Sequence, residues 1–423
     1  MNTTSHGDRR VHLNTAGVGR MSAAVRAVLT EWTCHEDRFG PYELEERLED
    51  VLHGEIHERL AALLGAPLGD TVLCTGAADA FAALLSRLPL GPGDRVWTTP
   101  YESAANLTTL FALRDRTRCR LDVVPLRHDG DLDLEWMAQH IGDDVALVCV
   151  PYVPSGCGIV NPVEDVGRIL APHRCLYAVD ASYAVGQLPV DVARIGCQLL
   201  TGDGWRFLRG PQSAGFAYVA PQLRQALAPN GGASPAVPDG ARVAALNTAL
   251  AEHATAAPHQ DLGPVLRAAV EQVPGTELID PGRTRSGILT FRHEELPAAL
   301  LRRGLADHGV AVWKTVAQET PMYLPRRGVV TAVRASVHHD NTAEDIEVFA
   351  DALLDLVTEA RGRRPAPAPR ALSAVPGTSA GARAGGGAPA VRGVLPRQRR
   401  AGQRHLTLVS GGPRDPIPLE PGA

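Results

Sequence analysis

The chain has 423 residues, 44% of them hydrophobic, so it is long enough for two ordinary domains and can bury a sizeable core. The seven cysteines are scattered, with no CxxC pair and no neighbouring histidine at metal-ligand spacing, so we interpret most of them as buried, reduced side chains. The formal net charge of −5 hides an asymmetry, because residues 361–423 carry 11 arginines against two acids while residues 1–360 are acidic.

The N-terminal 19 residues lack the basic start and the apolar run of a signal peptide, and no segment approaches the roughly 18 apolar residues of a membrane span. We therefore expect a cytoplasmic protein that has no membrane partner. Only one residue of the chain is a lysine, Lys314, against 41 arginines. This scarcity is the background against which any arginine in place of a lysine must be judged.

Short apolar runs alternate with amphipathic helical patterns over residues 31–255. The alternation predicts an α/β fold with a doubly wound, mostly parallel sheet, whose ligands gather at the carboxyl ends of the strands. Helices are predicted over 77–88 and 161–173, the second opened by Asn161 as cap and Pro162 as first-turn residue. The seven expected strands span residues 71–75, 94–99, 121–126, 145–151, 175–182, 197–203 and 214–220.

Residues 256–360 follow a different pattern, which predicts a smaller α+β domain. Its last helix is expected to start at Thr342, where Asp345 supplies an acid in the first turn. The expected strands span 286–294, 309–315 and 329–339, and the expected helices span 296–309 and 342–362.

The remaining residues, 361–423, are rich in Pro, Ala and Gly and poor in periodic apolar residues, so we expect a disordered basic tail. A basic tail can bind nucleic acid. This one has no interleaved aromatic residues, and we interpret it as a solvated linker without a nucleic-acid partner.

Seven motifs follow one another in an order typical of one enzyme family. They resemble the class V aminotransferases, fold-type I enzymes that depend on pyridoxal phosphate (PLP), and are most similar to hercynylcysteine sulfoxide lyase-like, isopenicillin N epimerase-like and cysteine desulfurase-like members. The resemblance implies a large cofactor domain at 31–255, a small domain at 256–360 joined by an N-terminal segment at 1–30, and a homodimer with active sites at its interface. The motifs are HLNTAG (12–17), CTGAADA (74–80), PYESAAN (100–106), VPSGCGIVNPVEDVG (153–167), VDASYAVGQLPVDV (179–192), GDGWRFLRGPQSAGFAYV (202–219) and VRASVHHDNTAED (333–345).

Two residues match binding groups of that family. Asp180 corresponds to the aspartate that pairs with the pyridine nitrogen of PLP, and Arg334, in an R-x-S pattern, to the arginine that binds the substrate's α-carboxylate. The resemblance also assigns Asn106 and Ser155 to the substrate site. Asp191, by contrast, is interpreted as a structural capping residue.

The residues that hold the cofactor in the family are replaced here. The Schiff-base lysine corresponds to Arg206, whose guanidinium stays protonated and cannot condense with an aldehyde. The phosphate-binding threonine corresponds to Ala78, which leaves only backbone N–H groups to hold an anion. The Ser or Thr three residues before the lysine corresponds to Asp203, whose negative charge would repel a phosphate unless Arg206 neutralises it.

Further departures surround the place of the cofactor ring. The ring-stacking His or Tyr corresponds to Ser103, and the Gln that contacts the ring hydroxyl corresponds to Tyr183. The segment that closes the phosphate site across the dimer corresponds to residues 235–246 and is shorter. The residues expected to line the remade cofactor site are Gly76, Ala77, Ala78, Ser103 and Trp205.

Lysine scarcity alone would explain Arg206, but it does not explain all of these changes together. PLP binding is therefore interpreted as abandoned or remade, and neither a covalent cofactor nor a metal is expected. A displaced Schiff base on Lys314, in a region that approaches the active-site mouth in the family, is kept as a hypothesis. So is a catalytic role for His338 or His339, of which only one would face the cleft because adjacent strand residues point to opposite faces.

Three functions stay open on this pattern. The first is an enzyme of specialised metabolism that acts without covalent PLP on a small amino-acid-like carboxylate, with Asp180, Tyr183, Asp203 and Arg206 as acid–base and anion-stabilising groups. A variant of it keeps PLP or its amine form as a non-covalent cosubstrate. The second is a lysine-less subunit that supports an active paralogue in a heterodimer. The third, an ordinary sulfoxide lyase or desulfurase, needs the missing lysine.

Overall fold

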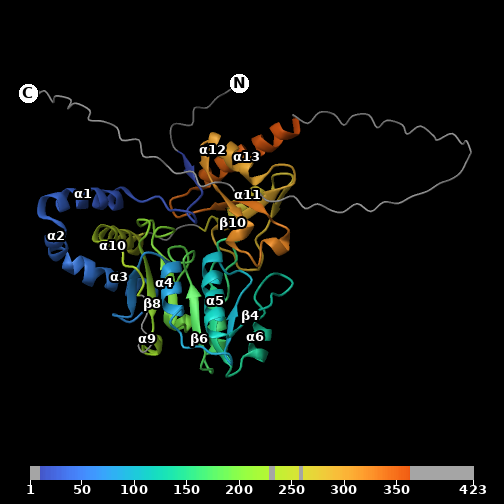
Figure 1. Cartoon of the computed structure of the whole chain (residues 1–423). Coiled ribbons are helices and arrows are strands. Elements are labelled where there is room, and N and C mark those ends of the chain that lie inside the picture. The colour runs from blue at the N-terminus through green and yellow to red at the C-terminus, as the bar shows by residue number, and fades with distance from the viewer. Residues whose placement is uncertain (1–9, 228–233, 257–260, 363–423) are drawn as a thin grey trace, which may run out of the picture. The chain divides into compact units, whose positions relative to one another are not determined.

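A computed structural model describes residues 10–227, 234–256 and 261–362 (Figure 1). The described residues belong to one compact unit, Met1–Pro365. The tail predicted to be disordered, 361–423, lies outside the described residues from residue 363 onward. Within the described part, no helix combines the length and the apolar character that crossing a membrane requires.

All seven strands predicted between residues 31 and 255 form a single sheet, so the predicted α/β fold is confirmed. The strand order is β2-β8-β7-β6-β5-β3-β4, and only β8 runs antiparallel to its neighbours. The strands are β2 (Thr71–Cys74), β3 (Arg95–Thr98), β4 (Arg120–Val123), β5 (Val145–Pro151), β6 (Leu176–Asp180), β7 (Leu199–Asp203) and β8 (Gly215–Val219).

Helices cover both faces of this sheet, which is why its central strands read as continuous apolar runs. In β5, Leu147 and Cys149 belong to the core beneath α4 and α5, whereas Val148 and Val150 belong to the core beneath α7. The helices of this part are α1 (Ala23–Phe39), α2 (Pro41–Arg47), the π-helical Asp50–Glu55, α3 (Ile56–Leu64), α4 (Ala77–Leu85), α5 (Ala104–Thr117), α6 (Leu134–His140), α7 (Val163–Leu170), α8 (Val192–Ile195), α9 (Pro221–Leu227) and α10 (Gly240–Thr255).

The predicted start of α7 is wrong by one residue. Pro162 occupies the N-cap position, and Asn161 does not cap the helix. Its side-chain N–H group instead donates to the carbonyl of Pro151 at 2.6 Å, which anchors the end of β5. Asp191 does cap α8 by accepting from the N–H groups of Ala193 and Arg194, so its structural interpretation is confirmed.

A second sheet of four antiparallel strands has the order β12-β13-β10-β9. Thr342 begins its last helix as predicted, because its hydroxyl accepts from the N–H of Asp345 (3.3 Å) and its own N–H donates to the Asp345 carboxylate (3.2 Å). The elements are β9 (Thr276–Leu278), β10 (Ile288–His293), β12 (Trp313–Val316), β13 (Thr331–Ser336), α11 (Gly263–Glu271), α12 (Ala298–Asp307) and α13 (Ala343–Gly362), with 3-10 turns at Ala317–Glu319 and Pro325–Arg327.

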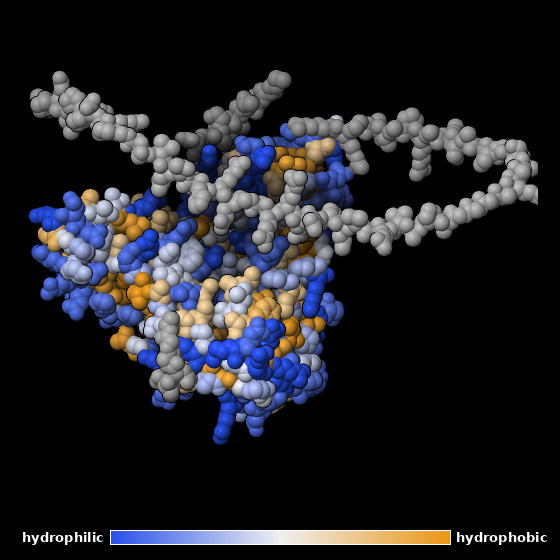
Figure 2. All heavy atoms as spheres, viewed as in Figure 1, coloured by the Kyte–Doolittle hydropathy of each residue, from blue (hydrophilic) through white to orange (hydrophobic). Residues whose placement is uncertain are grey.

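The N-terminal strand β1 (Val11–His12) pairs in parallel with β11 (Val310–Ala311), which precedes β12. Val11 and Leu13 also belong to the apolar core that packs the second sheet against α13. Whether domain boundaries lie at residues 30, 255 and 360 stays a prediction. On the face seen in Figure 2, hydrophilic residues cover most of the described surface and hydrophobic ones form small separate areas.

Candidate functional site

Asp203, the last residue of β7, lies buried against the N-terminus of α4. One carboxylate oxygen accepts the N–H of Ala77, the first residue of that helix, at 2.9 Å. The other oxygen accepts from Nε of Arg206 at 2.8 Å. Burial raises the pKa of Asp203, while Arg206 and the Ala77 N–H group oppose this rise. The carboxylate therefore occupies the place where a helix N-terminus would otherwise receive an external anion.

Arg206 is held from three sides. Besides Asp203, its Nη1 donates to the backbone carbonyls of Ala16 and Gly17, and its guanidinium carbon lies 4.0 Å from the centroid of the Tyr183 ring. The N-terminal segment passes so close that a Cβ on Gly19 would lie 2.1 Å from the carbonyl oxygen of Arg206. Arg206 thus links the end of β7 to the N-terminal segment through geometrically fixed contacts.

Trp205 fills the turn before α4. A Cβ built on Gly76 would lie 3.0 Å from Cη2 of this indole and 3.6 Å from a carboxylate oxygen of Asp203. Ala78, in the first turn of α4, is exposed and has no polar side-chain group to offer. The loop between β2 and α4 is therefore closed from inside by an indole and a carboxylate.

The segment at 235–246 contacts its own chain beside the same helix end. Thr75 donates its N–H to the carbonyl of Ala236 at 2.8 Å, and Ala236 donates its N–H to the Asp79 carboxylate at 2.9 Å. The resemblance predicts that this segment corresponds to one that reaches across a dimer. Here its first residues cover the β2–α4 turn of the chain to which they belong.

Asp180, the last residue of β6, is part of a buried chain of hydrogen bonds. Nδ2 of Asn106 donates to Asp180 and to Glu102, at 2.9 Å in each case. Ser182 donates both its N–H and its hydroxyl to the other oxygen of Asp180. Ser103 caps α5 by accepting from the N–H of Asn106. Asn106, predicted to bind substrate, thus lies between two carboxyl groups.

Sequence reasoning missed Glu102, although it stands inside the PYESAAN motif. Its side chain is fully buried, and Oε2 has no hydrogen-bond partner among the described residues. Burial, followed by repulsion from Asp180, raises the pKa of Glu102 to about 8. Glu102 stands four residues after the end of β3, and the sequence alone does not distinguish an acid at such a place from a turn residue.

The raised pKa of Glu102 predicts a pH dependence of stability. Between about pH 4.5 and pH 8 the folded protein keeps a proton on Glu102 that the unfolded chain has lost, so the free energy of unfolding falls as pH rises. The slope from one such group is about 1.4 kcal/mol per pH unit at most. In Glu102→Gln, the part of this pH dependence that comes from Glu102 is expected to disappear. Urea unfolding at several pH values measures it. The exposed Glu271→Gln is the control, and a slope that survives in Glu102→Gln would contradict the assignment.

Arg334 on β13 is buried and only partly satisfied. Its Nη1 donates to the backbone carbonyl of Ser155 at 3.0 Å, and the nearest carboxylate oxygen of Glu319 lies 3.7 Å away. Its Nε has no hydrogen-bond partner among the described residues. The guanidinium carbon lies 6.0 Å from the Tyr183 ring centroid, so Arg206 and Arg334 approach one aromatic ring. A buried donor of this kind is what a ligand carboxylate would satisfy.

Lys314 lies on a different face of the second sheet. The register of β12 and β13 pairs Trp313 with Arg334 and Lys314 with Val333. Val333 belongs to the core of that sheet, opposite the face that carries Arg334. The structure therefore gives no support to the hypothesis that Lys314 reaches the Tyr183 ring.

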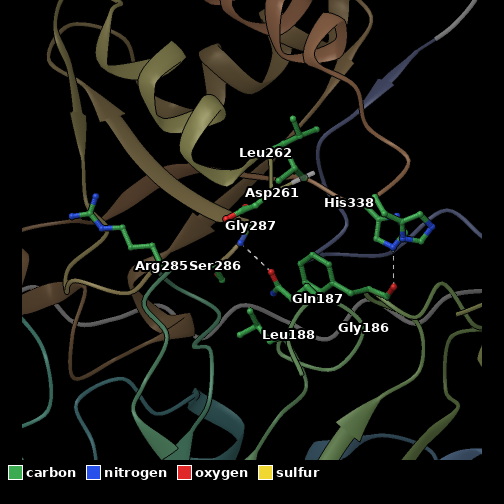
Figure 3. Close-up of a pocket in the computed structure, with 12 residues that line it drawn as sticks. Gly186, Gln187, Leu188, Asp261, Leu262, Arg285, Ser286, Gly287 and His338 are labelled. Carbon is green, nitrogen blue, oxygen red and sulfur yellow. Dashed lines mark hydrogen bonds between the residues drawn. The ribbon is translucent and has the colours of Figure 1, made fainter. Parts of the chain in front are cut away.

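His338 and His339 contradict the expectation that only one of them faces a cleft. Both line a cavity of about 190 Å³, and their ring centroids lie 3.8 Å apart (Figure 3). The alternation argument fails because β13 ends at Ser336, two residues before them. Burial, followed by the charge of His339, lowers the pKa of His338 to about 3. This cavity is lined by Gly186, Gln187, Leu188, Phe207, Asp261, Leu262, Arg285, Ser286, Gly287, Val337, His338 and His339.

The residues around α4 do not fit the phosphate of PLP. A carboxylate already accepts the Ala77 N–H group, an indole covers Gly76, and Arg206, which is predicted to correspond to the family's lysine, donates to the same carboxylate. A phosphate dianion at this helix end would meet the buried negative charge of Asp203 at short range. No chemical step through PLP is therefore assigned to these residues.

The chain is similar to a well-populated enzyme family. The family model for aminotransferase class-V matches residues 20–241. A probable cysteine desulfurase of Halobacterium salinarum is 30% identical, over 76% of this chain and 84% of the relative. A probable hercynylcysteine sulfoxide lyase of Mycobacterium tuberculosis is 27% identical, over 84% of this chain and 92% of the relative.

Solved structures agree with the fold. A cysteine desulfurase of Escherichia coli superposes with a TM-score of 0.74 at 20% identity, over 84% of this chain and 96% of that one. A cysteine desulfurase of Thermococcus onnurineus superposes with a TM-score of 0.73 at 18% identity, over 83% and 95%. Both likenesses confirm the fold-type I architecture expected from the order of the motifs.

Proposed function

Because this chain belongs to the class V aminotransferase family, we propose that it is an atypical enzyme which acts on a small amino-acid-like carboxylate without covalently bound PLP. The relatives are PLP-dependent enzymes of the cysteine desulfurase and lyase type, which supports an enzymatic role. The observation that carries the proposal is the Asp203 carboxylate, bound at once to Arg206 and to the Ala77 N–H group. This ion pair takes the place of both the Schiff-base amine and the phosphate.

In this proposal each side chain has a distinct task. Arg334 holds the substrate carboxylate through its unsatisfied Nε. Asp180 and the Tyr183 hydroxyl exchange protons with the substrate, and the Arg206 guanidinium stabilises negative charge that develops above the Tyr183 ring. Asp203 has both oxygens engaged in hydrogen bonds, so it positions Arg206.

A non-enzymatic function is the second candidate, and one observation favours it. Nε and Nη1 of Arg206 both donate hydrogen bonds within the chain, as those of a purely structural residue would. The protein would then be a lysine-less subunit that pairs with an active paralogue. A homodimer is the assembly proposed for the enzymatic alternative.

Binding of carboxylates tests the enzymatic proposal. The protein is titrated calorimetrically with α-amino acids, with 2-oxo acids and with amines that lack the carboxylate. We expect some of the carboxylates to bind and none of the amines. Arg334→Gln should weaken that binding about 10-fold or more, since a hydrogen bond to a charged group contributes about 1.5–3 kcal/mol, and Arg334→Lys should restore part of it.

Arg292→Gln, on the neighbouring strand β10 and paired with Glu277, is the matched control. Melting curves of all variants check that they fold. If no carboxylate binds, or if Arg334→Gln binds as tightly as the control, the proposal is wrong. If a paralogue is active only when it is co-expressed with this chain, the result favours the second candidate, a lysine-less supporting subunit.

A further inference from the structure

Three consecutive side chains outside the site around Tyr183 bring metal-ligand atoms together. His338, His339 and Asp340 follow the end of β13, and one ligand atom from each lies within 4.8 Å of the others. The sequence analysis predicted no metal. Only the turn after β13 directs the three side chains toward one point.

His338 has its tautomer fixed by the backbone. Its Nε2 lies 2.9 Å from the carbonyl oxygen of Phe207, so this nitrogen carries the proton and donates it (Figure 3). Nδ1 then holds the lone pair, which accepts the N–H of Asp340 in a long contact of 3.4 Å that a metal ion would displace. A histidine that donates one ring N–H to a carbonyl and offers the other nitrogen is the usual form of a metal ligand.

His339 and Asp340 complete the set. Nε2 of His339 lies 3.1 Å from Oδ1 of Asp340. Two tetrahedral ligands at zinc distances are about 3.4 Å apart, so a metal ion can replace the proton between these atoms with a small adjustment. Arg209 binds the other oxygen, Oδ2, at 2.7 Å, which leaves Oδ1 as the ligand atom but adds a nearby positive charge.

The cluster borders open space. His338 and His339 line the cavity of Figure 3, and His338 and Asp340 line a second cavity of about 300 Å³, whose wall also carries Arg10, Arg20, Arg26 and Arg209. Three protein ligands next to a cavity leave room for water or a small ligand as a further coordination partner, which is the arrangement of open metal sites. Two imidazoles with one carboxylate favour first-row transition metals over Mg²⁺ or Ca²⁺.

We propose that His338, His339 and Asp340 bind one divalent transition-metal ion, with an open coordination position toward the cavity beside Phe207. The site is independent of Asp203 and Arg334. The proposed metal site can therefore be tested independently of the proposed carboxylate chemistry.

Zn²⁺ titration of the full chain, freed of any affinity tag and of bound metal, tests the site. Calorimetry should show one Zn²⁺ per chain and no binding of Mg²⁺ at the same concentrations. His339→Ala and Asp340→Asn should each weaken Zn²⁺ binding about 10-fold or more, because even loss of residues behind the ligands typically costs that much. Both positions are accessible, so these changes do not require rebuilding of the core.

Two variants sharpen the result. His308→Ala removes an exposed histidine at the end of α12 and should leave Zn²⁺ affinity unchanged. Arg209→Gln removes the guanidinium that binds Oδ2 of Asp340, and it should tighten Zn²⁺ binding several-fold. The proposal is overturned if no Zn²⁺ binds, if His339→Ala binds as the parent does, or if His308→Ala causes the same loss.

Discussion

We expect an Arg206→Lys variant, incubated with PLP and reduced with borohydride, to carry no covalent PLP. The new lysine would restore the amine, but it would not clear the phosphate position, where Asp203 accepts the Ala77 N–H group and Trp205 covers Gly76. Removal of the guanidinium would also leave Asp203 without the hydrogen bond that Nε of Arg206 now donates. Intact-mass spectrometry of the reduced protein, with PLP retention after gel filtration, gives the answer.

A triple variant provides the positive arm of that experiment. Asp203→Ser and Ala78→Thr, combined with Arg206→Lys, return the family's residue types to the phosphate position and should allow labelling at residue 206. Lys314→Arg in each background shows whether any label sits on the only native lysine. Labelling of the unmodified protein, or of Arg206→Lys alone, would show that the helix end still accepts PLP.

Arg206→Met is expected to lower the free energy of unfolding by about 3–5 kcal/mol, the usual cost of leaving one partner of a buried ion pair unpaired. Asp203 is 4% exposed and has no second cation in the described contacts to take over. The double variant Asp203→Asn with Arg206→Met should regain part of the loss, since no buried charge remains. Urea unfolding at pH 7 measures all three proteins.

Arg242→Met is the matched control for this experiment. Arg242 and Asp239 form an ion pair with the same sequence spacing as Arg206 and Asp203, but both side chains are about half exposed. Because exposed pairs contribute little to stability, its removal should have a small effect. Equal losses in Arg206→Met and Arg242→Met would mean that burial of the Asp203 carboxylate is not the cause.

The large sheet was predictable because its strands are buried on both faces and joined by amphipathic helices, so each strand stands out as an apolar run. The order of motifs also predicts which positions of the cofactor site differ from those of the family. It did not reveal that Asp203 turns toward Ala77, because this contact joins residues 126 positions apart. The same limit hid the contacts of Arg206 with Ala16 and Gly17.

Three predictions at single positions were wrong or missed, each for a separate reason. Asn161 has the side chain of a helix cap, yet its Nδ2 donates to the carbonyl of Pro151 and its Oδ1 accepts no N–H group among the described residues. The prediction that His338 and His339 point to opposite faces assumed a strand that continues through both residues. The strand ends earlier, at Ser336. Glu102 had no signal of its own, since burial rather than residue type sets its protonation.

The N-terminal segment carries a consequence for the biosynthesis of the chain. Ala16 accepts from Arg206, 190 residues later, and donates to the hydroxyl of Ser336, 320 residues later. Synthesis releases the N-terminus first, and contacts over such separations carry a large loop-closure entropy until most of the fold exists. Ala16 is synthesised long before β13, so its docking waits for that strand and belongs to a late stage of folding.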